Sequence, residues 1–162
     1  MHHTISVLVV NQSGVLSRIS GLFSGRGFNI ESLNVAETND SGISRMTIVT
    51  RGDDKKIEQV TKQLNKLVDV IKVIDLTEEH FVDRELILVK MNAEVRVREE
   101  ILRIVDIFRA KVIDVNPDTY TVEITGDEGK TKGFLDLLKP LGIKEVVRSG
   151  RIAISRGIKP MN

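Results

Sequence analysis

The two halves of this chain show the same order of hydrophobic patterns, and this repeat constrains the fold more than any other feature. Short apolar or alternating runs, typical of strands, are separated by stripes of apolar residues at helical spacing. The first half reads in order as a strand at 4–10, a helix from residue 15 to the glycines at 25 and 27, extended chain at 29–36, a strand at 43–50, a helix from the cap Asp53 to about residue 68, and a strand at 70–76. This order is that of a ferredoxin-like unit.

The second half repeats the order after a polar stretch without clear periodicity. It reads as a strand at 84–93, a helix over 97–108, strands at 111–115 and 120–124, a helix at about 129–139 that ends at Pro140 and Gly142, and a strand within 145–155. We therefore predict an α+β fold of two tandem ferredoxin-like βαββαβ units, residues 1–77 and 84–162, joined by a linker at 78–83. Because a unit this small leaves one sheet face uncovered by its helices, we also expect a homodimer that buries this face.

Charge and composition exclude several classes of function. The chain has 24 Lys and Arg against 23 Asp and Glu, so its formal net charge is only +1, and it has no cysteine for disulfides, thiolate metal sites or nucleophiles. The expected central strands at 4–10 and 43–50 lack the aromatic residues on which RNA bases stack. No apolar run has the length of a membrane span, and the N-terminus does not resemble a signal peptide. We expect a cytoplasmic protein that binds neither nucleic acid nor membrane.

The chain is poor in residues suited to catalysis or metal binding. Its histidines are His2, His3 and His80, which the sequence places at a frayed N-terminus and in the linker. We interpret them as solvated surface residues rather than metal ligands. Pairs of acidic residues fall at helix starts or in the linker, where they favour the helix dipole or solvation. The sequence therefore predicts no active site, no metal site and no cofactor in this chain.

The segment around Gly14 combines a glycine-opened helix start with the end of the first strand. Unpaired N–H groups and the positive end of the helix dipole favour a small anion such as a carboxylate there. Asn11 and Asn29, each expected at a strand terminus, can donate to a carboxylate or accept from an ammonium, as binding of a free amino acid requires. An ordinary turn glycine and asparagines in turns or caps explain each residue equally well, so the residues alone leave both interpretations open.

Three runs in the first half carry a dense set of motifs: NQSGVLSRISGLF at residues 11–23, RGFNIESL at 26–33 and SRMTI at 44–48. They resemble the ACT domain of the acetolactate synthase (acetohydroxyacid synthase) small subunit. The runs QLNKLVDV at 63–70, ELILVK at 85–90, TGDEGK at 125–130, RSGRIA at 148–153 and SRG at 155–157 extend this resemblance over essentially the whole chain. The single ACT copy resembles the bacterial form of the family.

The resemblance implies a regulatory subunit without catalytic groups of its own. Such subunits bind and activate a separate large subunit, which carries thiamine diphosphate, magnesium and usually FAD, and they transmit feedback inhibition by valine or another branched-chain amino acid. The effector is implied to lie between two ACT domains, contacted from one chain by Asn11, Gly14, Val15 and Leu16 and from the other by Asn29 and Ile30. The amides of Val15 and Leu16 would meet the carboxylate, while Asn29 and Ile30 would hold the ammonium.

The second half is similar in fold to the C-terminal domain of nickel-responsive regulators, which bind metal through histidine and cysteine. Residues 81–162 contain neither, so nickel binding is not implied, and a role in dimerisation or subunit contact is expected. Two other classes of function stay open. One is a free-standing ACT-type sensor that regulates another enzyme or a transcription system, although no helix-turn-helix segment accompanies the units. The other is an enzyme in its own right.

Overall fold

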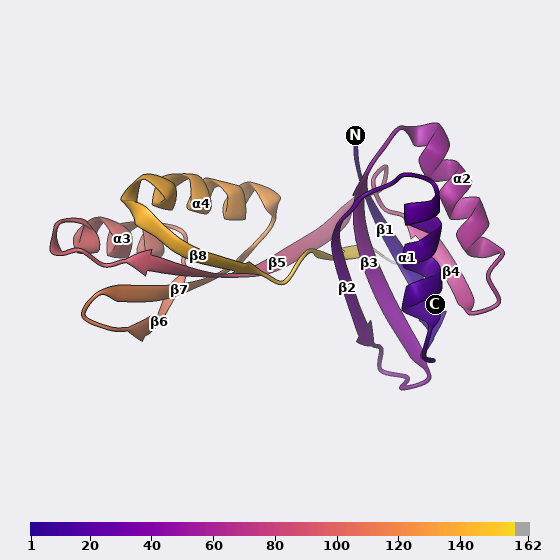
Figure 1. Cartoon of the computed structure of the whole chain (residues 1–162), viewed down its shortest axis with the longest axis horizontal. Helices are drawn as coiled ribbons and strands as arrows, with labels where there is room; N and C mark the ends of the chain where they lie inside the picture. Colours follow the sequence, from indigo (N-terminus) through magenta and orange to yellow (C-terminus); the bar gives the residue numbers. More distant parts are fainter. Residues whose placement is uncertain (158–162) are drawn as a thin grey trace. The chain divides into compact units, whose positions relative to one another are not determined.

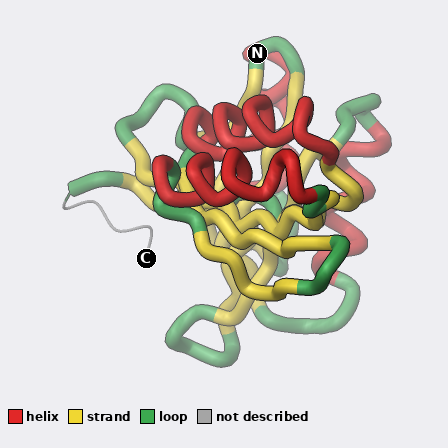
Figure 2. The backbone as a smooth tube through the Cα atoms, turned by 90° about the vertical axis from the view of Figure 1, so that its left-hand side faces the viewer, coloured by secondary structure: helices red, strands yellow, loops and turns green. Residues whose placement is uncertain are grey.

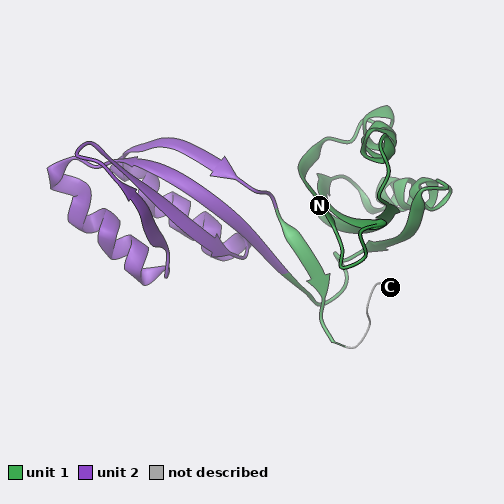
Figure 3. Ribbon diagram, turned by 90° about the horizontal axis from the view of Figure 1, so that it is seen from below, with its two compact units in different colours: residues 1–82, 151–162 green, residues 83–150 purple. Residues whose placement is uncertain are grey.

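The structure is a computed structural model in which residues 1–157 are described (Figure 1). The chain divides into two units, which Figure 3 shows in separate colours. Of the described residues, unit 1 contains 1–82 and 151–157, and unit 2 contains Asp83–Gly150. Each unit has an antiparallel sheet with two helices, which confirms the predicted α+β class with two ferredoxin-like units.

Unit 1 begins with the order βαββαβ. Its elements are β1 (His2–Val10), α1 (Val15–Gly25), β2 (Ile30–Glu37), β3 (Ile43–Arg51), α2 (Asp54–Asn65) and β4 (Val70–Asp75). The strands lie side by side in the order β2-β3-β1-β4, so β2 and β4 are the edges of this sheet among the described residues. The predicted elements agree with these bounds to within a few residues, except that α2 ends earlier and leaves Val68 almost fully exposed.

One face of the unit 1 sheet forms the core with both helices. The core contains alternate residues of β1 and β3 and the apolar stripes of α1 and α2. Its most buried members are Ile5, Val7, Val9, Val15, Ile19, Phe23, Met46, Ile48, Ile57, Val60 and Leu64. Alternation in the strands and 3.6-residue spacing in the helices place these side chains on the shared interface. Each such burial stabilises the fold by about 1.5–3 kcal/mol.

Unit 2 repeats the arrangement. Its elements are β5 (Phe81–Asn92), α3 (Val95–Ile107), β6 (Lys111–Val115), β7 (Thr119–Gly126), α4 (Glu128–Gly142) and β8 (Ile143–Arg148). The strand order β6-β7-β5-β8 matches that of unit 1, with β5 in the place of β1. In Figure 2 the two helices of this unit lie side by side over one face of the strands. Between them, the rings of Phe108 and Phe134 pack edge to face with their centres 5.5 Å apart.

The end of α4 agrees in part with the prediction, which names Pro140 and Gly142 as the residues that mark it. Pro140 lies inside the last turn, and the helix ends at Gly142. Proline removes one helical hydrogen bond, and here the helix continues only two residues beyond it. Gly142 has a φ of +100°, in the left-handed region that often terminates helices. The glycine rather than the proline therefore ends α4.

The predicted C-terminal strand at 145–155 is two strands. β8 ends at Arg148, and β9 (Ile152–Ser155) follows after Gly150, whose φ of +84° redirects the chain. β9 pairs with β5 and groups with unit 1 (Figure 3). The division therefore differs from the predicted boundaries at 1–77 and 84–162, and the predicted linker at 78–83 overlaps β5.

The second face of the unit 1 sheet is also buried. Ser6 is 0% and Leu8 is 6% exposed, although both alternate with the core residues of β1. Arg45 on this face donates from Nη2 to the carbonyl oxygen of Ala153 in β9 at 3.2 Å. The sequence predicts that a second copy covers such a face, whereas in unit 1 the returning C-terminal strand contributes to the cover. A homodimer of this unit would therefore use another surface.

Candidate functional site

The N-terminal end of α1 has no side-chain cap. Gly14 is its N-cap residue, and its φ of +85° lies in the left-handed region that favours glycine. The side chains of Asp53 and Asp127, in contrast, cap α2 and α4. The first N–H groups of α1, at Val15 and Leu16, cannot bond within the helix because no preceding turn supplies a carbonyl. The start of α1 can therefore offer main-chain donors to an anion.

Three hydrogen bonds hold Asn11 just after β1. Its main-chain N–H donates to the carbonyl of Gly42 at 2.9 Å. Its Nδ2 donates to Oε1 of Glu37 at 3.1 Å and to the carbonyl of Ser41 at 3.0 Å. These contacts use both hydrogens of the amide nitrogen, so Oδ1 is the atom that Asn11 can offer while they persist. Asn11 is thus suited to accept from an ammonium.

Arg18 lies over the helix start, a placement that the sequence pattern does not predict. Its side chain extends toward the N-terminal end of α1, as helical side chains do. Its Nη1 is 3.2 Å from the position that a Cβ on Gly14 would take. Its Nη2 forms an ion pair with Asp69. The main-chain carbonyl of Asp69 accepts from the N–H of Val10 at 2.8 Å, so the pair links α1 to the end of the sheet.

Asn29 and Ile30 lie beyond the other end of α1, where β2 begins. The hydroxyl of Thr50 in β3 donates to the main-chain carbonyl of Asn29 at 2.8 Å. Phe28, directly before Asn29, is buried and packs edge to face against Phe23 with ring centres 6.5 Å apart. These contacts position an exposed asparagine and a half-buried isoleucine at the C-terminal end of α1.

The predicted site residues therefore form two groups that one chain does not bring together (Figure 1). The group from Asn11 to Leu16 lies at the start of α1, and Asn29 and Ile30 lie past its end. With 11 residues, α1 spans roughly 16 Å at 1.5 Å per residue. Two hollows of about 530 and 460 Å³ in unit 1 share Arg26 and Gln59 in their walls, and neither is lined by a predicted site residue.

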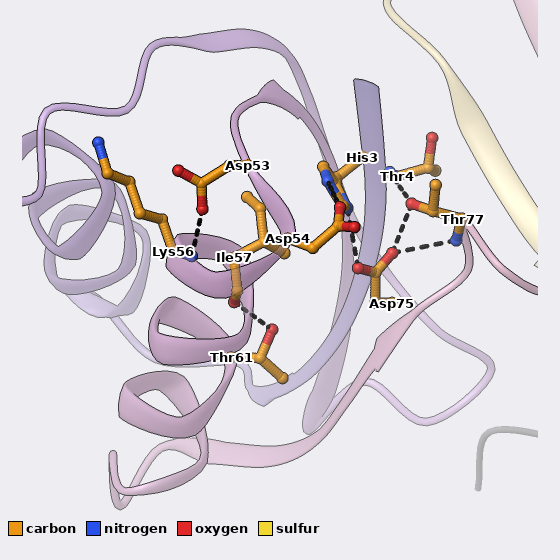
Figure 4. A network of polar contacts seen from close by, with 9 residues as sticks. All are labelled: His3, Thr4, Asp53, Asp54, Lys56, Ile57, Thr61, Asp75 and Thr77. Atoms are coloured by element: carbon orange, nitrogen blue, oxygen red, sulfur yellow. Dashed lines mark hydrogen bonds and ion pairs between the residues drawn. The ribbon is translucent and has the colours of Figure 1, made fainter. Parts of the chain in front are cut away.

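The structure contradicts the prediction that His3 is solvated (Figure 4). Its exposed fraction is 3%. A hydrogen bond of 3.0 Å joins its Nδ1 to Oδ2 of Asp75, while its Nε2 lies at an ion-pair distance of 3.2 Å from Oδ1 of Asp54 without hydrogen-bond geometry. Thr77 donates its main-chain N–H and its hydroxyl to Oδ1 of Asp75. The prediction failed because β1 begins at His2, which places His3 opposite Thr50 inside the sheet rather than in a frayed end.

Residues 1–157 contain no group of three or more histidine or acidic side chains placed to hold a metal ion. None of the helices described is both long and apolar enough to cross a membrane. The cluster around His3 instead connects β1, α2 and β4 through polar contacts.

Two family models match this chain, one in each half. The model of the AHAS small subunit-like ACT domain matches residues 5–72. The model of the small subunit of acetolactate synthase matches residues 84–157. Together they cover most of the chain.

Individual relatives agree with these models. The acetolactate synthase small subunit of Aquifex aeolicus is 56% identical over 155 residues, which are 95% of this chain and 81% of that protein. The probable acetolactate synthase small subunit of Archaeoglobus fulgidus is 53% identical over 159 residues, 98% of this chain and 99% of that protein. The crystal structure of the acetolactate synthase small subunit from Thermotoga maritima superposes with a TM-score of 0.87 at 40% identity, covering 98% of this chain and 99% of that one. The chain therefore belongs to the family of acetolactate synthase small subunits, which confirms the resemblance seen in its sequence.

Proposed function

We propose that this chain is the regulatory subunit of an acetolactate synthase in branched-chain amino acid biosynthesis. In this role it binds and activates a separate large catalytic subunit. It also transmits feedback inhibition by valine, or another branched-chain amino acid, bound between two ACT domains. The naming of its relatives as small subunits supports a partner of this kind.

The observation that carries the proposal is the placement of the two groups of site residues at opposite ends of α1. In a homodimer, a two-fold axis that passes beside the middle of α1, perpendicular to the helix, makes α1 antiparallel to its copy. The start of one α1, with Gly14, then faces the end of the other, with Asn29. Each dimer would hold two equivalent sites, and neither would be complete in one chain.

Two surface features favour a dimer of this geometry. Gly21 is exposed in the middle of α1, and a Cβ there would meet nothing within 4 Å. Glycine inside a helix costs roughly 0.5–1 kcal/mol relative to alanine, and close approach by a second helix would account for its presence. The neighbouring β2 is an edge strand, so its outer N–H and C=O groups can pair with another chain.

The chemistry of the two groups suits a zwitterion with an aliphatic side chain. The N–H groups of Val15 and Leu16 would receive the carboxylate, and Oδ1 of Asn11 can accept from the ammonium. Asn29 and the main chain of Ile30 from the second copy would complete the ammonium site. Leu16 is 44% exposed and would contact the aliphatic group.

The proposal assigns the chemistry of the holoenzyme to the large subunit. That subunit would carry thiamine diphosphate, magnesium and usually FAD. This chain would carry no cofactor and would bind neither nucleic acid nor membrane. Its proposed location is the cytoplasm, together with its partner.

A native pull-down with the tagged chain, followed by valine titration of the recovered acetolactate-forming activity, tests the proposal. The large subunit should co-purify, its activity should exceed that of the large subunit alone, and valine should lower it. Recovery of an unrelated enzyme or a transcription factor would favour the free-standing sensor instead. Activity from this chain alone would favour an enzyme.

Calorimetry on the isolated chain tests the shared site. Because an effector held by two chains is linked to their association, valine should raise both the melting temperature and the dimer fraction. If calorimetry shows no heat of valine binding and the melting temperature does not change with valine, the assignment of the effector site is refuted.

A further inference from the structure

The guanidinium of Arg18 faces two places at once. Its Nη1 lies over Gly14, at the helix start proposed to receive the effector's carboxylate, and its Nη2 pairs with the carboxylate of Asp69. The side chain of Arg18 is 51% exposed, whereas that of Asp69 is 20% exposed. Arg18 is thus accessible from solvent and already bound to a carboxylate of the chain itself.

We infer that Arg18 is a further ligand of the effector's carboxylate, and that Asp69 is the internal competitor that occupies Arg18 when no effector is bound. The inference rests on the proposed function, because it concerns the same site. It adds a charged side chain to a set of residues that otherwise offers main-chain donors and amides.

The chemistry of the guanidinium favours this exchange. Its planar donors match a carboxylate, and a positive charge discriminates an amino acid from a neutral analogue. Because Gly14 has no side chain, the space beside Nη1 stays open to a ligand. An ion pair as exposed as that between Arg18 and Asp69 is weak, so one carboxylate can replace another at little cost.

The competition gives Asp69 a role in setting the sensitivity of the site. A carboxylate that holds Arg18 lowers the apparent affinity for the effector, because the effector must displace it. The main-chain carbonyl of Asp69 accepts a hydrogen bond from the N–H of Val10, so the displaced carboxylate stays near the end of β1. Effector binding would thereby change contacts at this end of the sheet as well as at α1.

Calorimetric titration of the full chain with valine, and with valinamide, tests the inference. Arg18→Gln should weaken valine binding roughly fivefold to twentyfold, the effect of losing a charge-assisted hydrogen bond at a partly exposed site. Asp69→Asn should strengthen it severalfold, because a neutral amide competes less well for the guanidinium. The double variant should bind like Arg18→Gln, since the competitor has no effect once its target is absent.

Two comparisons separate recognition of the carboxylate from general damage. Valinamide has no carboxylate, so Arg18→Gln should leave its affinity unchanged. Arg103→Gln is a control for the loss of a helical arginine in an ion pair, because Arg103 pairs with Glu100 in unit 2 at 3.1 Å. Its valine affinity should equal that of the wild type. Circular dichroism checks that each variant is folded. Arg18→Lys keeps the charge but not the planar donors, so it should bind valine with intermediate affinity.

The outcomes distinguish this inference from the proposed function. Equal valine affinity in the wild type and Arg18→Gln, or weaker binding in Asp69→Asn, would overturn the role of Arg18 and leave the effector site in place. Absence of valine binding to the wild type would overturn the effector site and this inference together.

Discussion

Gly52 packs against the ring of Phe28 so closely that a Cβ at residue 52 would lie 2.1 Å from Cε1. The contact therefore requires glycine directly after β3. Phe28 is 8% exposed and directly precedes Asn29, so this packing also determines where the second half of the proposed site begins. This pair therefore connects the core of unit 1 to the proposed effector site.

Gly52→Ala should lower the free energy of unfolding by about 1–3 kcal/mol, the usual cost of overpacking. It should also weaken valine binding, because the displaced ring of Phe28 carries Asn29 with it. Chemical denaturation and calorimetry measure the two effects. Gly129→Ala is the control, since its Cβ would make only an ordinary contact of 3.7 Å with Asp127. Unchanged stability in Gly52→Ala would show that the ring has room to move.

Gly14→Asp should abolish feedback inhibition while the fold is retained, because its carboxylate takes the place of the effector's. The Gly14→Ala variant separates the effect of the added charge from the effect of backbone strain, because alanine introduces a side chain without a charge. At a φ of +85°, a side chain costs about 1–2 kcal/mol of stability, and a Cβ would also press on Arg18 at 3.2 Å. Valine titration of the holoenzyme should show much weaker inhibition of the Gly14→Asp variant than of the Gly14→Ala variant. Normal inhibition of Gly14→Asp would contradict the anion site.

His3→Ala should lower the stability of unit 1 by about 1–3 kcal/mol, because Asp75 loses a buried hydrogen-bond partner. His2→Ala is the matched control on the neighbouring residue. The side chain of His2 is 44% exposed and pairs with Glu31 at 3.0 Å, and loss of such an exposed contact should cost less than about 1 kcal/mol. Denaturation curves of the two variants should therefore differ clearly. Equal curves would indicate that the contacts around His3 add nothing to stability.

Arg45→Met should loosen β9. Burial lowers the pKa of Arg45, because desolvation disfavours its charged form. Its partners are the hydroxyl of Ser6 at 2.9 Å and the carbonyl of Ala153 at 3.2 Å. Since methionine removes both the half-buried charge and its hydrogen bonds, the global free energy of unfolding should change by less than about 1.5 kcal/mol.

Hydrogen exchange of the amides in β9 measures the local effect of Arg45→Met. Exchange there should accelerate, since one anchor of the strand is lost. Arg51→Met, which removes an exposed ion pair with Glu31 instead, should leave β9 unchanged. Equal hydrogen-exchange protection of the β9 amides in both variants would show that pairing with β5 is enough to hold β9 in place without Arg45.

Local patterns in the sequence determined the elements and their order. Strand alternation and helical stripes depend on periods of two and 3.6 residues, and the caps at Asp53 and Asp127 depend on neighbours three residues away. These signals require no knowledge of the path of the chain. The same holds for the start of α1 at Gly14, which the sequence located correctly as a helix N-terminus.

Only the tertiary structure decided the contacts between segments that are distant in sequence. The pair of Arg18 and Asp69 joins residues 51 positions apart, and the hydrogen bond between His3 and Asp75 joins residues 72 apart. The return of β9 to unit 1 depends on the turn at Gly150 and on its pairing with β5. No local period records such contacts, because they are set by how the sheets assemble. The sequence thus predicted the residues of the proposed site, whereas the fold placed them at opposite ends of one helix.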